Sequence, residues 1–149
     1  MVMRESATAH VDASPAAVFA RLTDIARLAE WNDGITQVLE QPAQLTPGAV
    51  WKVRMRALGQ SWVSRSTLVE FDAEQGRFRH RSQTDDGNPS YADWDWTVQR
   101  DGTGTRVTVT VELHPRTFWR KYLLVHLRRP ALRSEMRASL RALSATVSA

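Results

Sequence analysis

The stretch YADWDWTV, residues 91–98, places two tryptophans and two aspartates in strict alternation. An α-helix turns about 100° per residue and would scatter Trp94 and Trp96 over different faces, whereas a strand sends alternate side chains to opposite sides. We therefore predict a strand whose apolar face carries both tryptophans. Asp93 and Asp95 form its other, acidic face. The tryptophans must then pack in a filled core or line a cavity, and this choice decides the function.

Similar alternating segments lie on both sides of this strand, separated by turn residues such as Pro47-Gly48 and Asp101-Gly102. Such brief connections favour antiparallel neighbours in a meander. No helical period occurs between residues 35 and 115. Together with a first strand at residues 6–13, the pattern predicts seven strands, of which the other six lie at 35–40, 49–58, 60–71, 76–84, 90–100 and 104–114.

Two short helices are predicted between the first and second strands. Ser14 offers an N-cap oxygen, and Pro15 suits the first helical position. This helix ends near Asp24, which can cap a second short helix that runs to Trp31. Both helices therefore interrupt the sheet early in the chain.

The last part of the chain returns to helical spacing. A helical segment starts near Thr117, and we expect Pro130 to kink or break it, because proline removes a helix hydrogen bond. We predict a long C-terminal helix with an apolar stripe. The stripe consists of Leu132, Met136, Leu140, Leu143 and Val147.

Composition limits the class of protein. A chain of 149 residues with 42% hydrophobic residues can form one domain with a core, and we treat residues 1–149 as a single domain. The absence of cysteine leaves no disulfide framework and no thiolate nucleophile. The first residues lack an apolar leader, and no apolar run approaches the length of a membrane span. We therefore expect a soluble cytoplasmic protein.

Five segments carry a resemblance to a known family: VDASPAAVFARLTD at 11–24, LAEW at 28–31, PG at 47–48, LVEFD at 68–72 and RDGTGTRVTV at 100–109. Together with the order of elements, they resemble the SRPBCC superfamily, which includes START-like lipid-binding domains, polyketide cyclases and dehydrases, and Bet v 1-type proteins. The resemblance covers essentially the whole chain. It implies an α+β helix-grip fold, in which a seven-stranded curved antiparallel sheet wraps around a long C-terminal helix.

The resemblance also implies a deep cavity between sheet and helix that holds a hydrophobic or aromatic small molecule, lipid-like or polyketide-like. Because a fold does not determine a function, the lining residues have to support this. The alternation rule assigns an inner face to each strand. The candidate ligand-binding residues are Trp51, Val53, Met55, Phe78, His80, Trp94, Trp96, Val109 and Val111, with Trp119 and Leu123 from the helical segment. The rival interpretation is that these side chains simply fill the core.

The strand at residues 60–71 has no single apolar face. Trp62 and Leu68 share one parity, whereas Val69 and Phe71 share the other. A β-bulge between the two sets would reconcile them, because one extra residue reverses the side to which the following side chains point.

Charged residues occupy the outer face of two neighbouring strands. Asp93 and Asp95 are expected to pair across strands with Arg77, Arg79 or Arg81. The acidic neighbours offset the arginine row, and no aromatic side chains are interleaved for base stacking. We therefore predict a solvated charged face and no nucleic-acid partner.

His80 is the histidine predicted on the inner face. It can serve as an acid or base, or as the polar group that orients a ligand. Tyr91, at the start of its strand, could donate a proton at the pocket mouth. No Ser/His/Asp constellation, metal-ligand spacing or phosphate loop is recognisable. Catalytic residues therefore stay unassigned, and we expect no metal and no other cofactor.

The net charge of +4 is concentrated near the C-terminus, since residues 116–149 hold 8 of the 20 basic residues and 1 of the 16 acidic ones. Residues 116–133 could form a basic amphipathic helix that lies on an anionic membrane, or they could be part of the ordinary gripped helix. The sequence thus predicts binding of a hydrophobic small molecule. A polyketide cyclase-like or dehydrase-like enzyme and a membrane-docking lipid carrier stay open as alternatives, and no oligomeric state is indicated.

Overall fold

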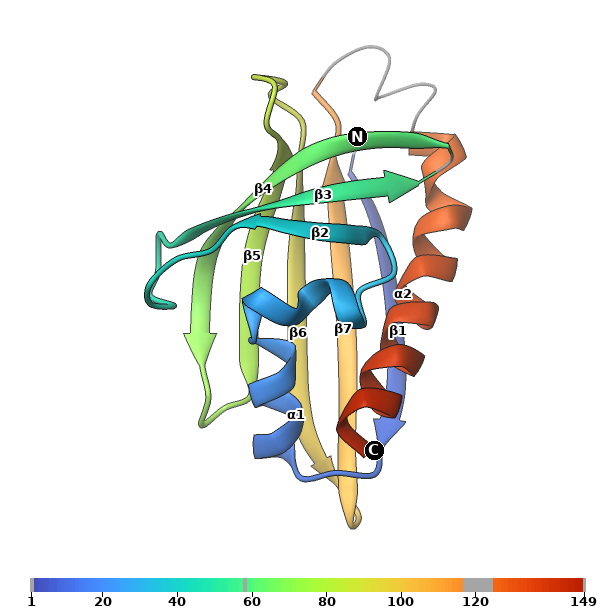
Figure 1. The fold of residues 1–149 in the computed structure, drawn as a ribbon. Coiled ribbons are helices and arrows are strands. Elements are labelled where there is room, and N and C mark those ends of the chain that lie inside the picture. The colour runs from blue at the N-terminus through green and yellow to red at the C-terminus, as the bar shows by residue number, and fades with distance from the viewer. Residues whose placement is uncertain (1, 58, 117–124, 149) are drawn as a thin grey trace.

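The computed structural model describes residues 2–57, 59–116 and 125–148, with side chains described as far as 116 and again for 132–147. Two short helices follow the first strand, the other six strands come next, and a long helix completes the described residues (Figure 1). In chain order the elements are β1 (Met3–Val11), α1 (Pro15–Leu22), η1 (Ile25–Glu30), β2 (Ile35–Glu40), β3 (Val50–Ala57), β4 (Gln60–Asp72), β5 (Arg77–Thr84), β6 (Tyr91–Asp101), β7 (Gly104–His114) and α2 (Val125–Ser148).

The seven strands form one antiparallel sheet in the order β1-β7-β6-β5-β4-β3-β2. Strands β2 to β7 form a meander, and β1 joins the far edge beside β7, where Ala7 lies opposite Val109. The sheet curves so that β2 and β3 cross in front of β6 and β7, while α2 packs mainly along β1 (Figure 1). This architecture confirms the predicted helix-grip fold with its seven strands, early short helices and C-terminal helix.

The first helix begins as its sequence indicates. The Ser14 hydroxyl accepts a hydrogen bond from the Ala17 backbone N–H at 3.2 Å, and proline occupies the first turn. This side chain satisfies one of the helix's free N-terminal donors. The second predicted helix is a 3₁₀-helix, η1, whose Ile25 and Leu28 are buried. Both short helices therefore contribute apolar side chains to the interior.

Strand β1 begins at Met3, three residues earlier than the alternating pattern indicated, and this adds Glu5 to the buried positions of the strand. Glu5 is only 6% exposed, and its carboxylate accepts two hydrogen bonds from the Arg133 guanidinium of α2, both 3.1 Å long. A buried carboxylate requires such partners. The ion pair therefore fixes α2 to the edge strand of the sheet.

Strand β4 contains the expected bulge, and the structure places it at Val69. Leu68 lies opposite His80, whereas Glu70 lies opposite Arg79, so Val69 is the extra residue and is exposed. Before the bulge the even-numbered side chains point inward; after it, Phe71 shares the face of Phe78 and its ring packs 5.3 Å from the ring of Phe19, although 36% of the residue stays exposed. The bulge thus explains the change of parity between Leu68 and Phe71, while Val69 points to solvent.

Helix α2 continues through Pro130, so the break predicted at this residue does not occur. Proline removes one backbone donor, but the apolar stripe that follows packs into the core and holds the helix. The buried residues of this stripe are Leu132, Met136, Leu140 and Leu143. No helix within the described residues is long and apolar enough to span a membrane.

Cross-strand ion pairs cover the outer face of β5 and β6, as the alternating pattern predicted. Arg81 contacts Asp93 at 2.7 Å, and Asp95 lies 3.4 Å from Arg77 and 3.6 Å from Arg79.

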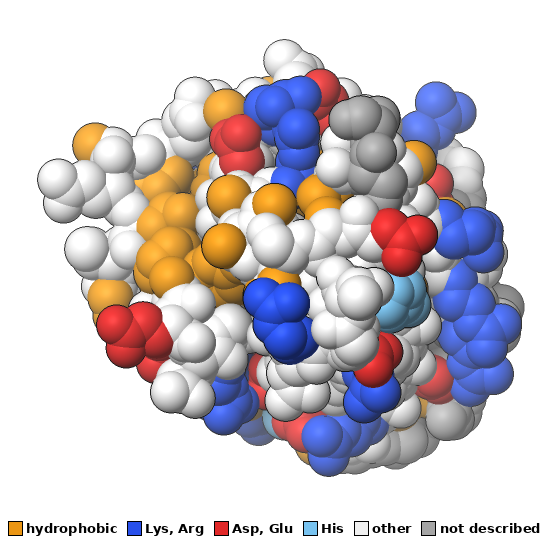
Figure 2. Space-filling view, turned by 90° about the horizontal axis from the view of Figure 1, so that it is seen from below, with side chains coloured by type: hydrophobic (Ala, Val, Ile, Leu, Met, Phe, Trp, Pro, Cys, Tyr) orange, Lys and Arg blue, Asp and Glu red, His pale blue; other side chains and the backbone are white. Residues whose placement is uncertain are grey.

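Figure 2 views the molecule from the end at which α1 lies. It shows basic and acidic side chains mixed over this end, with apolar side chains gathered on one side.

Gly76 brings β5 close to β6 at the start of the row of inner aromatic residues. Its φ angle is +67°, and its carbonyl accepts a hydrogen bond from the Val98 N–H at 2.8 Å. A Cβ atom at this position would lie 2.1 Å from the Val98 carbonyl oxygen. Only glycine therefore fits both the backbone conformation and the available space.

We expect Gly76→Ala to lower the free energy of unfolding by more than about 2 kcal/mol, because it combines a left-handed backbone with a steric clash. Gly87→Ala is the matched control, since Gly87 also has a positive φ of +81° but a Cβ there would meet nothing within 4 Å. Gly87→Ala should lower the free energy of unfolding by about 1 kcal/mol. Urea unfolding of both variants measures the difference, and equal losses would contradict the close approach to Val98.

Candidate functional site

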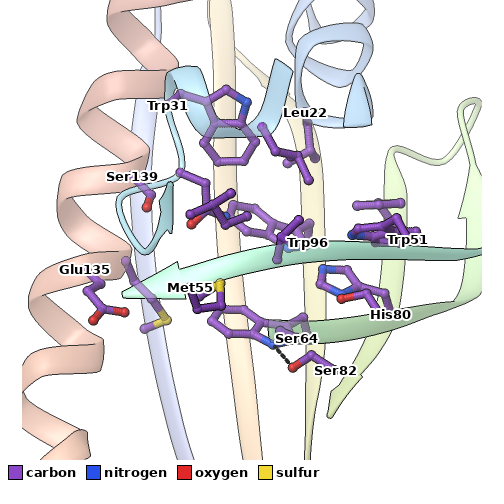
Figure 3. A pocket seen from close by; sticks show the side chains of 18 residues that line it. Leu22, Trp31, Trp51, Met55, Ser64, His80, Ser82, Trp96, Glu135 and Ser139 are labelled. Carbon is purple, nitrogen blue, oxygen red and sulfur yellow. Dashed lines mark hydrogen bonds between the residues drawn. The ribbon is translucent and has the colours of Figure 1, made fainter. Parts of the chain in front are cut away.

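A cavity of about 70 Å³ lies between the curved sheet, the η1 region and α2 (Figure 3). The sheet contributes one wall from β3, β4, β5 and β6. The opposite wall comes from α1, η1, the turn after η1, the first residue of β2, and α2. Its residues are Leu22, Leu28, Trp31, Asn32, Ile35, Glu135, Met136 and Ser139.

A row of aromatic rings forms the sheet side of the cavity. The imidazole of His80 lies parallel to the indole of Trp94, with 6.1 Å between ring centroids and 8° between planes. His80 also contacts Trp51 at 5.2 Å and Phe78 at 5.3 Å. Trp94 in turn stacks with Trp96 at 6.5 Å. The alternation along β5 and β6 produces this row, because these rings share the inner face of paired strands.

Two nitrogen atoms of the lining are buried and find no hydrogen-bond partner among the described residues. They are Nδ1 of His80 and Nε1 of Trp31, whose ring packs edge-on against Trp96 at 5.6 Å. By contrast, Nε1 of Trp94 donates a hydrogen bond to the Ser82 hydroxyl at 3.0 Å. A buried polar group without a partner costs free energy. The cavity thus offers unused hydrogen-bonding capacity within an aromatic wall.

Burial among these rings lowers the pKa of His80 from 6.5 to about 3, and the negative charge of Asp93 opposes this shift only in part. The physical cause is desolvation, because a charged imidazolium loses its water in an aromatic environment. The imidazole is therefore neutral at neutral pH. In this form one ring nitrogen donates and the other accepts a hydrogen bond.

The helical wall adds polar groups that the sequence patterns did not indicate. In Figure 3, Glu135 projects from α2 beside Met55, and Ser139 lies one turn further along the helix. The Ser139 hydroxyl accepts a hydrogen bond from the Asp33 N–H at 2.8 Å. Gly34 allows the turn before β2 to lie close to Met55, since a Cβ at residue 34 would lie 2.9 Å from the terminal carbon of Met55. The sequence feature that could have indicated this wall is the apolar stripe of α2. Glu135 directly precedes Met136 of that stripe.

The structure brings together seven of the residues predicted to line a cavity. These are Trp51, Val53, Met55, Phe78, His80, Trp94 and Trp96. The sheet wall also includes three serines outside the predicted ligand-binding set, Ser64, Ser66 and Ser82, of which Ser82 lies on the predicted inner face of its strand. Ser64 and Ser66 are the inward residues of β4 before its bulge, so their role depended on the parity that the sequence left open.

Val109 and Val111 do not belong to the cavity wall, although both face inward and are fully buried. They lie opposite Trp96 and Trp94 in the register of β6 and β7, and the larger indole rings form the lining at these two positions. The two valines are therefore core residues. Trp119 and Leu123, the other two predicted residues, lie outside the described residues.

Tyr91 is not at a pocket mouth, which corrects the suggested role as a proton donor. Its ring stacks on His114 with 4.5 Å between centroids, and the Arg81 guanidinium lies 4.0 Å above it. Residue 91 has the same parity as Asp93 and Asp95, so its side chain points to the outer face of β6. Its hydroxyl therefore belongs to a different surface from the cavity.

Comparison with known proteins identifies the family. The model of the family described as polyketide cyclase / dehydrase and lipid transport matches residues 4–148. No curated protein matches this sequence. The family match and the structural neighbours confirm the resemblance to the SRPBCC superfamily.

Solved structures share the fold over nearly the whole chain. The Zhui aromatase/cyclase from Streptomyces sp. R1128 is 16% identical, with a TM-score of 0.78 over 99% of this chain and 94% of its own. Ara h 8.0201 is 14% identical, with a TM-score of 0.74 over 99% and 98%. Protein CV1439 from Chromobacterium violaceum is 22% identical, with a TM-score of 0.72 over 98% and 97%. At these identities the similarity shows the fold.

The low pKa of His80 predicts how stability depends on pH. Unfolded chains take up a proton on this group below pH 6.5, whereas the folded protein resists protonation down to about pH 3. Stability is therefore lost as the pH falls through this window, and His80 alone should account for about 2 kcal/mol between about pH 7 and pH 5. We expect the free energy of unfolding of His80→Phe, which keeps a ring at this position, to fall by about 2 kcal/mol less than that of the wild type between pH 7 and pH 5. Urea unfolding at both pH values checks this, and parallel losses would contradict a buried neutral imidazole.

Proposed function

Because the chain belongs to the polyketide cyclase / dehydrase and lipid transport family, we propose that it binds a hydrophobic or aromatic small molecule in the cavity between its sheet and α2. The observation that carries this proposal is the combination of an aromatic wall with the unpartnered nitrogens of His80 and Trp31. A ligand with a flat apolar body and a few polar groups would satisfy both features.

The binding free energy would come mainly from burial of apolar ligand surface against Trp51, Trp94 and Trp96. The neutral imidazole of His80 would orient the ligand through a hydrogen bond. The Trp31 indole would donate a second one from the opposite wall. Because unpaired buried polar groups are costly, a ligand that lacks matching groups would bind less well.

The size of the cavity adds a condition. Ligand pockets usually measure about 300–1,000 Å³, so a cavity of about 70 Å³ must widen to admit a multi-ring molecule. Met55 is suited to move, because it is unbranched and lies at the edge of the wall next to α2. Rearrangement of Met55, and of α2 where it faces the sheet, is therefore part of the proposed binding step.

A second candidate is a cyclase-like or dehydrase-like enzyme that uses the same cavity. Its specific support is the carboxylate of Glu135, which lies in the lining and could take or give a proton. His80 is a weak candidate for this role, because an imidazole with a pKa of about 3 is not in its acidic, imidazolium form at neutral pH and is a weak base. Turnover of a candidate polyketide, followed by mass spectrometry, separates this enzyme from a simple binding protein.

A membrane-docking lipid carrier is the remaining alternative from the sequence. Its basic amphipathic segment, residues 116–133, lies almost entirely outside the side chains that the structure describes. Co-sedimentation with vesicles that contain an anionic phospholipid tests it directly, because binding through basic side chains depends on vesicle charge and on salt.

The binding proposal predicts that the protein retains a small molecule when it is purified gently from its own host. Native mass spectrometry should then show a species of definite added mass that is lost on denaturation. An empty protein whose tryptophan fluorescence also ignores a panel of lipids and aromatic compounds would contradict the proposal and favour a filled core.

Filling the cavity should block binding. Ser66 is buried in the cavity wall, and Ser66→Leu places a larger apolar side chain there. We expect the affinity for the fluorescent probe 1-anilinonaphthalene-8-sulfonate to fall by about tenfold or more, equivalent to about 1.4 kcal/mol. Thr67→Leu is the matched control, because the next residue of β4 points to the other face of the sheet. Equal affinity in the wild type and both variants would show that the probe binds elsewhere.

A further inference from the structure

The outer face of the sheet carries a cluster of three potential metal ligands that has no part in the cavity. Asp93 of β6 lies directly opposite Glu112 of β7, and His114 follows two residues later on the same face. Nε2 of His114 lies 3.8 Å from Oδ2 of Asp93 and 3.6 Å from Oε2 of Glu112. One donor atom from each residue lies within 4.8 Å of the other two donor atoms.

The geometry points to a binding site for a divalent transition-metal cation, which we propose is formed by Asp93, Glu112 and His114. Zinc binds histidine nitrogen and carboxylate oxygen at about 2.0–2.2 Å, so two donors of a tetrahedral site lie about 3.4 Å apart. The observed separations of 3.6 and 3.8 Å are close to this value. The donor oxygens of Asp93 and Glu112 lie within 4.8 Å of each other, so the two carboxylates would approach by up to about 1.4 Å when a metal binds.

The histidine nitrogen supplies a second, independent observation. The His114 side chain is 18% exposed, but its Nε2 atom is shielded from solvent, faces both carboxylates at 3.8 and 3.6 Å, and has no hydrogen-bond partner among the described residues. Its ring is held in place by parallel stacking on Tyr91 at 4.5 Å. A ligand that is oriented before the metal arrives loses little conformational freedom on binding. An unused nitrogen in a fixed ring is therefore suited to coordination.

A second histidine on this protein shows what an ordinary ion-pair cluster looks like. His10 also lies near two carboxylates, but Asp12 contacts its Nε2 at 3.2 Å and Asp101 contacts its Nδ1 at 3.4 Å. The two carboxylates thus lie on opposite sides of the ring and cannot share one metal with it. At His114 both carboxylates converge on a single nitrogen, and this convergence distinguishes the two clusters.

The neighbouring arginines leave room for a cation. Arg81 donates to Oδ1 of Asp93 at 2.7 Å and to Oδ2 at 3.1 Å, while Arg4 lies 3.9 Å from the other oxygen of Glu112. Each carboxylate oxygen has two lone pairs, so Oδ2 can accept from Arg81 and still coordinate a metal. A polar groove of about 250 Å³ is lined by Asp93 and Glu112 together with Arg4, Arg79 and Arg81, and it gives solvent access to the two carboxylates. Water can therefore complete the coordination.

No short ligand spacing in the sequence revealed this cluster, because its members come from two strands that only the sheet register brings together. The aromatic cavity lies on the inner face of the same strands, so metal binding on the outer face does not depend on the proposed ligand function.

Zinc chloride titration by isothermal calorimetry, in a buffer that does not chelate metals, tests the site. We expect one Zn²⁺ per chain in the wild type and an affinity reduced by about tenfold or more in both His114→Ala and Glu112→Gln. Glu112→Gln changes no side-chain volume, so it keeps the test valid if His114→Ala folds poorly. His10→Ala is the matched control and should bind as the wild type does.

Histidine side-chain NMR adds a readout at the proposed ligand. Zn²⁺ should shift the Nε2 resonance of His114 and leave the resonances of His10 unchanged. Wild-type affinity in both ligand variants, loss of binding in His10→Ala, or no binding to the wild type would each overturn the proposal.

Discussion

The two-residue alternation along the paired strands β5 and β6 is the constraint on which the rest of this structure depends. It sends His80, Trp94 and Trp96 to one side of the sheet and Arg81 and Asp93 to the other. The aromatic wall of the cavity and the charged outer face are therefore two consequences of one pairing register. A shift of this register by one residue would bury the charges and expose the rings. Both changes cost free energy, so they stabilise the observed register.

Desolvation gives the cavity its chemical character. The rings that exclude water around His80 keep its imidazole neutral, and the same exclusion makes each unpaired nitrogen expensive. An interior of this kind favours recognition over proton transfer, because it supplies neutral hydrogen-bonding groups next to large apolar surfaces. The helical wall differs, since Glu135 brings a carboxylate to the edge of an otherwise aromatic site.

The strand pattern and the family resemblance predicted the fold, and the alternation rule identified the sheet side of the cavity. Which side chains face inward could be predicted because strand parity is a local property of the chain. The helical wall was not predicted, since the way η1 and α2 face the sheet depends on packing between distant segments; Trp31 and Glu135 are examples. The selection of Val109 failed for a related reason, because parity indicates which side chains point inward but not which of two paired neighbours reaches the cavity.

The pairing of β1 with β7 has a consequence for how the chain folds. A hydrogen bond between the Ser6 hydroxyl and the Val109 carbonyl joins residues 103 positions apart, and β7 is the neighbour of β1 in the sheet. Contacts between such distant residues slow folding, because a large loop must close before they form. Strand β1 therefore stays without its neighbour in the sheet until β7 has been synthesised. Helix α2 packs on that strand and follows β7 in the chain, so the helical wall of the cavity also depends on contacts between segments far apart in sequence.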